Sequence, residues 1–217
     1  NRTNAVGIAN GLAWTSVGGE ILPIEVLVIP DGTGKIELTG SLGDVMKESA
    51  KLAVSYVRVH GAEYHIDPAV LKKADIHIHA PEGAVPKDGP SAGVTLTTAL
   101  VSCLSGMAVR ADVAMTGEIT LHGNVLPIGG LKEKSMAAYR EGIKTVLIPK
   151  DNVSDLFEVD DEVKKAVEFL PMSNLEQVLK AALVWPKASE KKSRSKKAAA
   201  PIAGGDRKDP LENVVQQ

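Results

Sequence analysis

The strongest constraint on the fold of this chain is the segment Ser91–Leu104, which is apolar on almost every side of a helix. Such a helix has no face that favours contact with water, so it must be buried. The Gly- and Pro-containing segment Pro81–Pro90 before it is predicted to be a polar loop. We therefore predict a buried helix that the chain enters through a sharply bent loop.

The size and composition of the chain are those of a globular protein. It has 217 residues, which favours one domain, and 44% of them are hydrophobic. No stretch approaches the ~18 consecutive apolar residues of a membrane-spanning helix. The lone Cys103 favours a reducing compartment, and we expect a buried, inert thiol. Because residue 1 is Asn and no signal-peptide pattern follows, we expect a piece of a longer protein.

Charge divides the chain into a body and a tail. Residues 186–217 hold eight Lys or Arg against four Asp or Glu, a balance of +4, and residues 1–185 hold 17 against 23, a balance of −6. We predict one domain over residues 1–185 and a basic, disordered tail over residues 186–217, which has few large apolar side chains. The acidic body and its scarce aromatic residues argue against a nucleic-acid-binding domain. Nucleic acid could then bind only to the tail or to parts outside this chain.

The first part of the body has the pattern of a β-meander. Residues 5–16, 20–30 and 35–40 are rich in β-branched side chains and separated by Gly-containing turns, so we predict three antiparallel strands. From Ser41 to His60 the period becomes helical, and Gly61 follows the end of this helix. The face predicted to be buried comprises Val45, Met46, Ser49, Ala50, Ala53 and Val57.

Shorter elements follow, with helices interleaved among strands. The order favours an α+β fold over a regular βαβ repeat. We predict strands at residues 75–79, 113–115, 119–121 and 145–148, a helix at 130–140, and a last helix opened by a capping box at 173–176.

Ser91 allows three interpretations. At the first turn of the buried helix, its hydroxyl could act as a nucleophile, because the N–H groups there lack helical partners and would stabilise an oxyanion. Ser91 or Asp88 could instead simply cap the helix. A phosphate-binding loop is disfavoured, because no Lys-Ser or Lys-Thr pair follows the glycines.

A serine nucleophile needs a base, and the chain offers two kinds. The five histidines (His60, His65, His77, His79 and His122) could all serve geometrically. A lysine could also serve if burial lowers its pKa. On the helix predicted at 130–140, Lys134 shares an arc with Leu131, Ala137 and Ala138, whereas Lys132 lies beside charged residues. Lys134 is therefore the candidate for burial, although a lysine in that position could also extend its ammonium to water.

Two alternating patterns suit a metal ion in principle. His77 and His79 face the same side of a predicted strand, and Glu118, Thr120 and His122 alternate similarly. The sequence fixes no third ligand, so we predict no metal site.

The segment Pro86–Gly93, Pro-Lys-Asp-Gly-Pro-Ser-Ala-Gly, resembles the nucleophile motif of A-type Lon proteases residue for residue. The resemblance runs from about Val6 to Val184 and ends before the tail. Four further segments match other signatures of that family in order and spacing: Gly11–Thr15, Gly40–Met46, Arg110–Leu121 and Val125–Lys134.

The resemblance assigns roles to five residues. It implies that Ser91 is the nucleophile and Lys134 its general base, a Ser–Lys dyad. Thr116 matches a threonine near the dyad, Asp88 an acidic residue beside the serine, and Trp14 a strand that lines the substrate groove. From the residues alone, Thr116 could be a turn residue, Asp88 a cap and Trp14 a core side chain.

The resemblance also implies a ribosomal-S5-like α+β fold and a function. The chain would be the proteolytic domain of an ATP-dependent serine endopeptidase that degrades unfolded, damaged or regulatory proteins. It would need no cofactor for peptide hydrolysis, form homo-hexamers, and depend on an upstream ATPase part that holds ATP and Mg²⁺. We expect a bacterial cytoplasm rather than a mitochondrial matrix, and no membrane partner. The rival is a non-catalytic Lon-like scaffold or peptide-binding domain, which the presence of both dyad residues disfavours.

Overall fold

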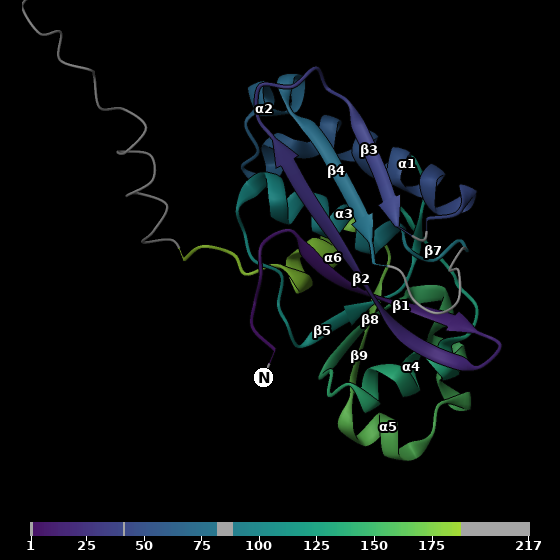
Figure 1. The fold of residues 1–217 in the computed structure, drawn as a ribbon. Helices are drawn as coiled ribbons and strands as arrows, with labels where there is room; N and C mark the ends of the chain where they lie inside the picture. Colours follow the sequence, from purple (N-terminus) through teal and green to yellow (C-terminus); the bar gives the residue numbers. More distant parts are fainter. Residues whose placement is uncertain (1, 41, 82–88, 188–217) are drawn as a thin grey trace, which may run out of the picture. The chain divides into compact units, whose positions relative to one another are not determined.

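The computed structural model of the chain describes residues 2–40, 42–81 and 89–187. Figure 1 shows how their helices and strands are arranged. Asp88 and residues 188–217 lie outside the described residues, so the predicted role of Asp88 and the predicted disorder of the tail stay predictions.

Seven strands form one mixed sheet. Strand β2 runs antiparallel to both of its neighbours, and the other neighbouring pairs are parallel. A separate ribbon pairs β6 (Glu118–Ile119) with β7 (Val125–Leu126). In spatial order the seven strands are β3 (Ile36–Gly40), β4 (Asp75–Ala80), β2 (Gly18–Ile29), β1 (Ile8–Thr15), β5 (Val113–Met115), β8 (Thr145–Pro149) and β9 (Glu168–Met172).

Helices are interleaved with these strands, in agreement with the predicted α+β class. Within the described part of the chain, no helix has the length and apolar character needed to cross a membrane. The helices are α1 (Asp44–His60), α2 (Pro68–Lys73), α3 (Gly93–Ser105), α4 (Leu131–Arg140), α5 (Asp161–Ala166) and α6 (Leu175–Ala182), with 3-10 segments at Gly61–Tyr64 and Lys150–Glu158.

The predicted antiparallel meander is wrong at its third strand. Strands β1 and β2 form the expected hairpin, but β4 lies between β2 and β3, and β3 runs parallel to β4. The reason is the connection between β3 and β4, which contains α1 and α2. A helical crossover returns the chain to the same end of the sheet, so the two strands it joins are parallel.

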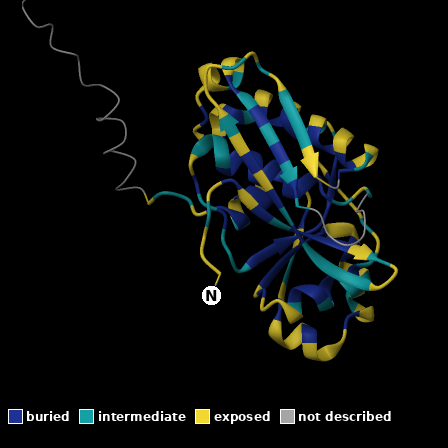
Figure 2. Cartoon of the chain, viewed as in Figure 1, coloured by how far each residue is buried: buried dark blue, intermediate teal, exposed yellow. Residues whose placement is uncertain are grey.

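The sheet is covered on its two faces by different helices. Because side chains alternate along a strand, Val113 and Met115 join the hydrophobic cluster around α3, whereas Ala114 joins the cluster around α4 and α5. Helix α3 packs against β1, β2, α1 and α6, and helix α4 against β1, β2 and α5. Figure 2 shows the resulting buried interior, and in Figure 1 α4 and α5 lie beside β8 and β9.

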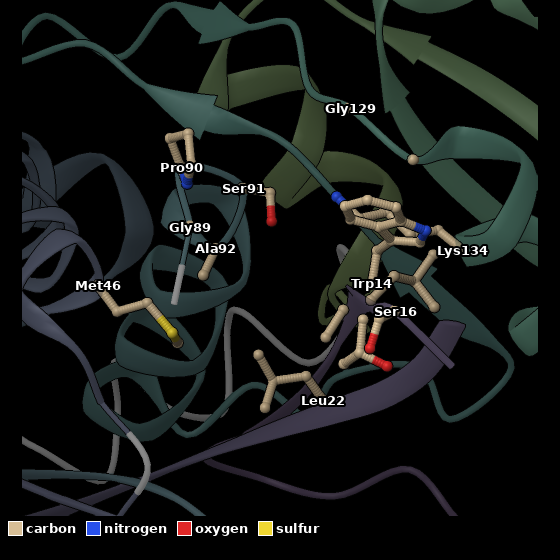
Figure 3. A pocket seen from close by; sticks show the side chains of 14 residues that line it. Trp14, Ser16, Leu22, Met46, Gly89, Pro90, Ser91, Ala92, Gly129 and Lys134 are labelled. Carbon is tan, nitrogen blue, oxygen red and sulfur yellow. The ribbon is translucent and has the colours of Figure 1, made fainter. Parts of the chain in front are cut away.

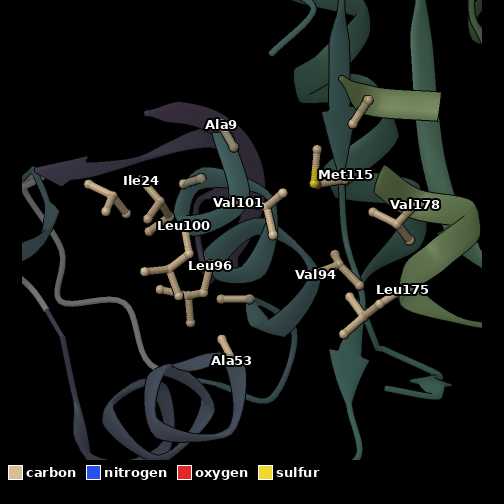
Figure 4. Close-up of a cluster of buried hydrophobic side chains, with 14 of the residues drawn as sticks. Ala9, Ile24, Ala53, Val94, Leu96, Leu100, Val101, Met115, Leu175 and Val178 are labelled. Atoms are coloured by element: carbon tan, nitrogen blue, oxygen red, sulfur yellow. The ribbon is translucent and has the colours of Figure 1, made fainter. Parts of the chain in front are cut away.

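Helix α3 is buried as predicted, and it lies at the centre of the larger cluster. Leu96 and Leu100 are fully buried, and Figure 4 shows them near Ile24 of β2 and Ala53 of α1. The helix begins at Gly93, so Ser91 precedes it instead of lying in its first turn. A Cβ at Gly93 would lie 2.3 Å from Glu118 Oε1, so glycine allows the helix to start this close to β6.

Three smaller expectations need correction. On α1, Val45 is 42% exposed, because it lies in the first turn of the helix. Tyr56, which was not predicted to be buried, is buried. Residues 120–121 are not in the strand that begins at Glu118, because the chain turns there and Thr120 N–H bonds Asn124 O. The cap of α6 is shifted by one residue: Asn174 Oδ1 accepts from Gln177 N at 3.0 Å, and Gln177 Oε1 accepts from Ser173 N at 2.7 Å.

Leu100→Ala should lower the free energy of unfolding by about 2–5 kcal/mol, because it leaves a cavity in the centre of the packed cluster. Val17→Ala is the control, since Val17 is 86% exposed in the β1–β2 turn, and it should change stability by no more than about 0.5 kcal/mol. Urea unfolding of both variants measures the difference. Equal stability of the two variants would contradict the placement of α3 at the core.

Candidate active site

A cavity of about 570 Å³ brings together side chains from distant parts of the chain. Strand β1, the loop before α3 and the start of α4 form its walls, and β2 and α1 contribute Leu22 and Met46. Both Ser91 and Lys134 line it. Figure 3 shows Ser91 on one side of this space and Trp14 and Lys134 on the other. We call it the Ser91 cavity.

Backbone hydrogen bonds hold Ser91 on both of its sides. Its N–H donates to Gly89 O at 3.0 Å, and its carbonyl oxygen accepts from Gly117 N at 2.9 Å. The carbonyl of Gly117 in turn accepts from Val94 N at 3.1 Å. Gly117 is therefore bonded both to Ser91 and to the first turn of α3. The Ser91 side chain is half-buried and faces the cavity (Figure 3).

Lys134 is 3% exposed, although its side chain carries an amine. Burial lowers its pKa from the ordinary 10.5 to about 8, because a charged ammonium loses its hydration there. The helical arc predicted for this residue is confirmed, since Leu131, Ala137 and Ala138 are also buried. Lys132 is exposed on another side of α4, as predicted.

Thr116 contacts the buried amine directly. Lys134 Nζ donates to Thr116 Oγ1 at 3.1 Å, and Thr116 is 1% exposed. The backbone N–H of Thr116 bonds Leu147 O of β8 at 3.1 Å, which holds the residue at the end of β5. Thr116 lies between β5 and β6, where no turn is formed, and of its two interpretations the position beside the lysine agrees with this contact.

Trp14 lines the Ser91 cavity and is 55% exposed, so the alternative interpretation as a core side chain is wrong. The indole ring lies against the N-terminal end of α4, where the N-cap residue Gly130 has φ +73°. A Cβ at Gly130 would lie 2.9 Å from Trp14 Cγ. Glycine at position 130 therefore permits the indole to pack closely at the start of the helix that carries Lys134.

The histidines do not join this site. Within the described residues, the lining of the Ser91 cavity contains no histidine. On the outer face of β4, His77 and His79 both bond Thr39 Oγ1, at 2.7 and 2.8 Å. Over residues 2–40, 42–81 and 89–187, no group of three or more His, Cys, Asp or Glu side chains is arranged to hold a metal ion.

Cys103 also lies apart from the cavity. It is only partly buried, in the last turns of α3, so the expectation of a buried thiol needs correction. The reason is its place near the end of the helix, where the last two residues, Leu104 and Ser105, are also only partly buried. Burial still raises the pKa of the thiol, which favours the less reactive protonated form.

Sequence reasoning missed the environment of Glu118. The sequence places this residue only within an alternating polar pattern, yet the residue is 8% exposed. Ser49 Oγ donates to Glu118 Oε2 at 2.7 Å, and Ile119 N donates to Oε1 at 2.9 Å. The available signal was Ser49 itself, because a polar residue on the predicted buried face of α1 needs a buried partner.

The chain matches known proteins over most of its length. The profile of the Lon protease (S16) C-terminal proteolytic domain matches residues 1–185. Lon proteases of Chloroflexus aggregans, Azospirillum brasilense and Brevibacillus choshinensis are 58%, 60% and 53% identical to the chain, over 82%, 82% and 88% of it. The chain spans 22% of the first two relatives and 24% of the third.

The buried amine should make stability depend on pH. In the unfolded chain Lys134 stays charged up to about pH 10.5, whereas in the fold its pKa is about 8. Stability should therefore rise as the pH increases from 8 to 10.5, by about 3 kcal/mol for the full difference. Lys134→Met should be more stable than the parent at pH 7, and this gain should shrink as the pH approaches 10.

Denaturant unfolding at several pH values measures this gain, and Lys132→Met is the matched control because Lys132 is exposed. The control should show no such pH-dependent gain. If Lys134→Met and Lys132→Met respond alike between pH 7 and 10, Lys134 is not desolvated.

Proposed function

Because this chain belongs to the Lon protease family, as its C-terminal proteolytic domain, we propose that Ser91 and Lys134 are the catalytic dyad of a serine endopeptidase. One observation carries the assignment of these two residues. An amine whose pKa is lowered to about 8 and a serine hydroxyl line the same cavity, and they come from different parts of the chain. A neutral amine can accept a proton from a serine, whereas an exposed lysine at neutral pH cannot.

In the proposed mechanism, neutral Lys134 takes the proton of Ser91 Oγ as this oxygen attacks the scissile carbonyl carbon. The resulting ammonium returns the proton to the leaving amine as the peptide bond breaks, and an acyl-enzyme forms on Ser91. Water, activated by Lys134 in the same way, then releases the acyl group. Thr116 Oγ1 accepts one N–H of Lys134 at 3.1 Å and so orients Nζ through the cycle.

The start of α3 is the proposed site of oxyanion stabilisation. The N–H groups of a first helical turn lack intrahelical partners and carry a partial positive charge. Val94 N–H is already bonded to Gly117 O. We assign the N–H groups of Ala92 and Gly93 to the oxyanion, because they lie between Ser91 and that bonded position in the chain.

The substrate is proposed to bind as an added strand beside β1. The pairing of β1 with β5 is limited to Gly11↔Met115, and β5 ends there. Beyond Gly11, residues Leu12–Ser16 line the Ser91 cavity, and Trp14 forms part of its wall. Main-chain hydrogen bonds to such a strand would not depend on substrate side chains, which suits the degradation of many different unfolded proteins.

The wider activity is proposed from the relatives, because the chain covers only 22–24% of their length. We propose that the whole protein is an ATP-dependent protease that degrades unfolded, damaged or regulatory proteins as a homo-hexamer. ATP and Mg²⁺ would belong to its ATPase part, and the dyad chemistry requires no metal or organic cofactor. A ribosomal-S5-like fold and a bacterial cytoplasmic location belong to the same proposal, the latter supported by the bacterial origin of the relatives.

Ser91→Ala should remove peptidase activity and leave the fold intact. Its stability should change by no more than about 0.5 kcal/mol, because Ser91 precedes the cap of α3 and its side chain does not cap the helix. Cleavage of a fluorogenic peptide by the longer protein that carries the ATPase part measures the loss. Full activity of Ser91→Ala would contradict the nucleophile assignment and revive the non-catalytic scaffold.

Lys134→Arg should be inactive although it retains the charge, because a guanidinium does not release its proton near neutral pH. Lys132→Ala is the control from the same helix and should retain most activity, since its side chain is exposed. The same peptide assay compares them. Inactive Lys132→Ala together with active Lys134→Arg would overturn the dyad.

The activity of the unmodified protein should rise with pH through an ionisation at about 8, because the neutral form of Lys134 is the base. A plot of kcat/KM against pH with a short peptide substrate reports this ionisation. A profile that is flat from pH 7 to 9 would contradict a base with this pKa.

A further inference from the structure

Three consecutive residues after β5 each hold a different part of the site. Thr116 Oγ1 accepts from Lys134 Nζ, and Gly117 bonds Ser91 through its N–H and Val94 through its carbonyl. Glu118 comes next, and its side chain bonds Ser49 of α1. The first two residues belong to the proposed dyad environment already described, but Glu118 has had no role so far.

Glu118 is wedged between α1 and the first residue of α3. Its Oε1 lies so close to Gly93 that a Cβ at Gly93 would be 2.3 Å away, and its Oε2 lies 2.7 Å from Ser49 Oγ. A second cavity, of about 320 Å³, is lined by Glu118, by Pro90, which directly precedes Ser91, and by side chains of α1. Removal of the Glu118 carboxyl would enlarge this cavity under Pro90 and free the start of α3 to move.

The contacts of Glu118 suit the protonated acid. Ser49 Oγ lies within hydrogen-bond distance of both Glu118 Oε2 and Val45 O, at 2.7 and 3.2 Å, but has one proton to donate. If Glu118 is protonated, its O–H can donate to Ser49 Oγ in place of the reverse bond, and Ser49 can then donate to Val45 O, so every donor is used. Burial raises the pKa of Glu118, which favours this form. A glutamine can make the same two contacts with its amide, donating to Ser49 Oγ and accepting from Ile119 N.

We propose that Glu118 is a positioning residue, which fixes the start of α3 against α1 and thereby sets Ser91 in the correct place for Lys134. The inference rests on the proposed Ser91–Lys134 dyad. Glu118 does not touch the reacting atoms, so its effect acts through Gly93, Pro90 and Gly117. Small displacements of a reacting group slow a reaction strongly, so removal of the Glu118 side chain should lower the rate of reaction at Ser91.

The test measures the rate at which a fluorophosphonate labels Ser91 in the 217-residue chain, with Ser91→Ala as the blank. Glu118→Ala should label about 10- to 100-fold more slowly than the parent. Glu118→Gln should label within about threefold of the parent, because the amide retains the contacts to Ser49 and Ile119. Glu48→Gln is the matched control and should label at the parent rate, because Glu48 is an exposed carboxyl that lines the 320 Å³ cavity together with Glu118.

Melting temperatures and peptide kinetics separate positioning from a purely structural role. Ser49→Ala removes the partner but leaves Glu118 against Gly93, and it should lower the melting temperature while slowing labelling less than Glu118→Ala. In the longer protein, Glu118→Ala should lower kcat with little change in KM, and Glu118→Gln should restore kcat.

The outcomes distinguish the two proposals. If the parent chain does not label at Ser91 and the longer protein with its ATPase part also fails to label there, the dyad itself is wrong. If the parent labels and folded Glu118→Ala labels equally fast, the dyad stands and the role of Glu118 is overturned. If Glu118→Gln is as slow as Glu118→Ala, the neutral hydrogen-bonding role is wrong.

Discussion

The burial of α3 is the constraint from which the rest of the structure follows. A helix that is apolar on almost every side must be enclosed, and here β1, β2, α1 and α6 enclose it. Leu96 and Leu100 fill the interior, and Gly93 lets the helix begin against Glu118. Because Ser91 lies two residues before this fixed helix, its backbone has little freedom. The stability of the core and the position of the proposed nucleophile therefore have the same origin.

The site forms where two layers of the molecule meet. Ser91 belongs to the layer of α3 on one face of the sheet, and Lys134 belongs to α4 on the other face. They reach one cavity at the end of β5, where the pairing of β1 with β5 stops at Gly11↔Met115. The segment Thr116–Glu118 follows directly and bonds both layers. The carboxyl ends of parallel strands are a common place for a ligand site. Here the Lys134 side chain of α4 reaches this place from the opposite face of the sheet.

Much of this could be predicted from the sequence, and the failures have physical causes. Periodicity identified α1, α3 and α4, and the 100° spacing of a helix separated buried Lys134 from exposed Lys132, because burial on a helix follows from local geometry. The order of the strands could not be predicted in the same way. It depends on which edges pair after a crossover, and β4 inserted between β2 and β3. The contact between Glu118 and Ser49 joins residues far apart in sequence, so no local pattern contains it.

The proposed role of Lys134 as a base at neutral to mildly alkaline pH depends on desolvation, which lowers the pKa of its amine. The most direct measurement is an NMR titration of the Lys134 side chain, with the ¹³Cε signal assigned by comparison with Lys134→Met. The midpoint should lie at about pH 8, because burial is the cause of the lowered pKa. A midpoint at the 10.5 of an exposed lysine would contradict it, since the amine would then be charged at every pH at which the protein is expected to act.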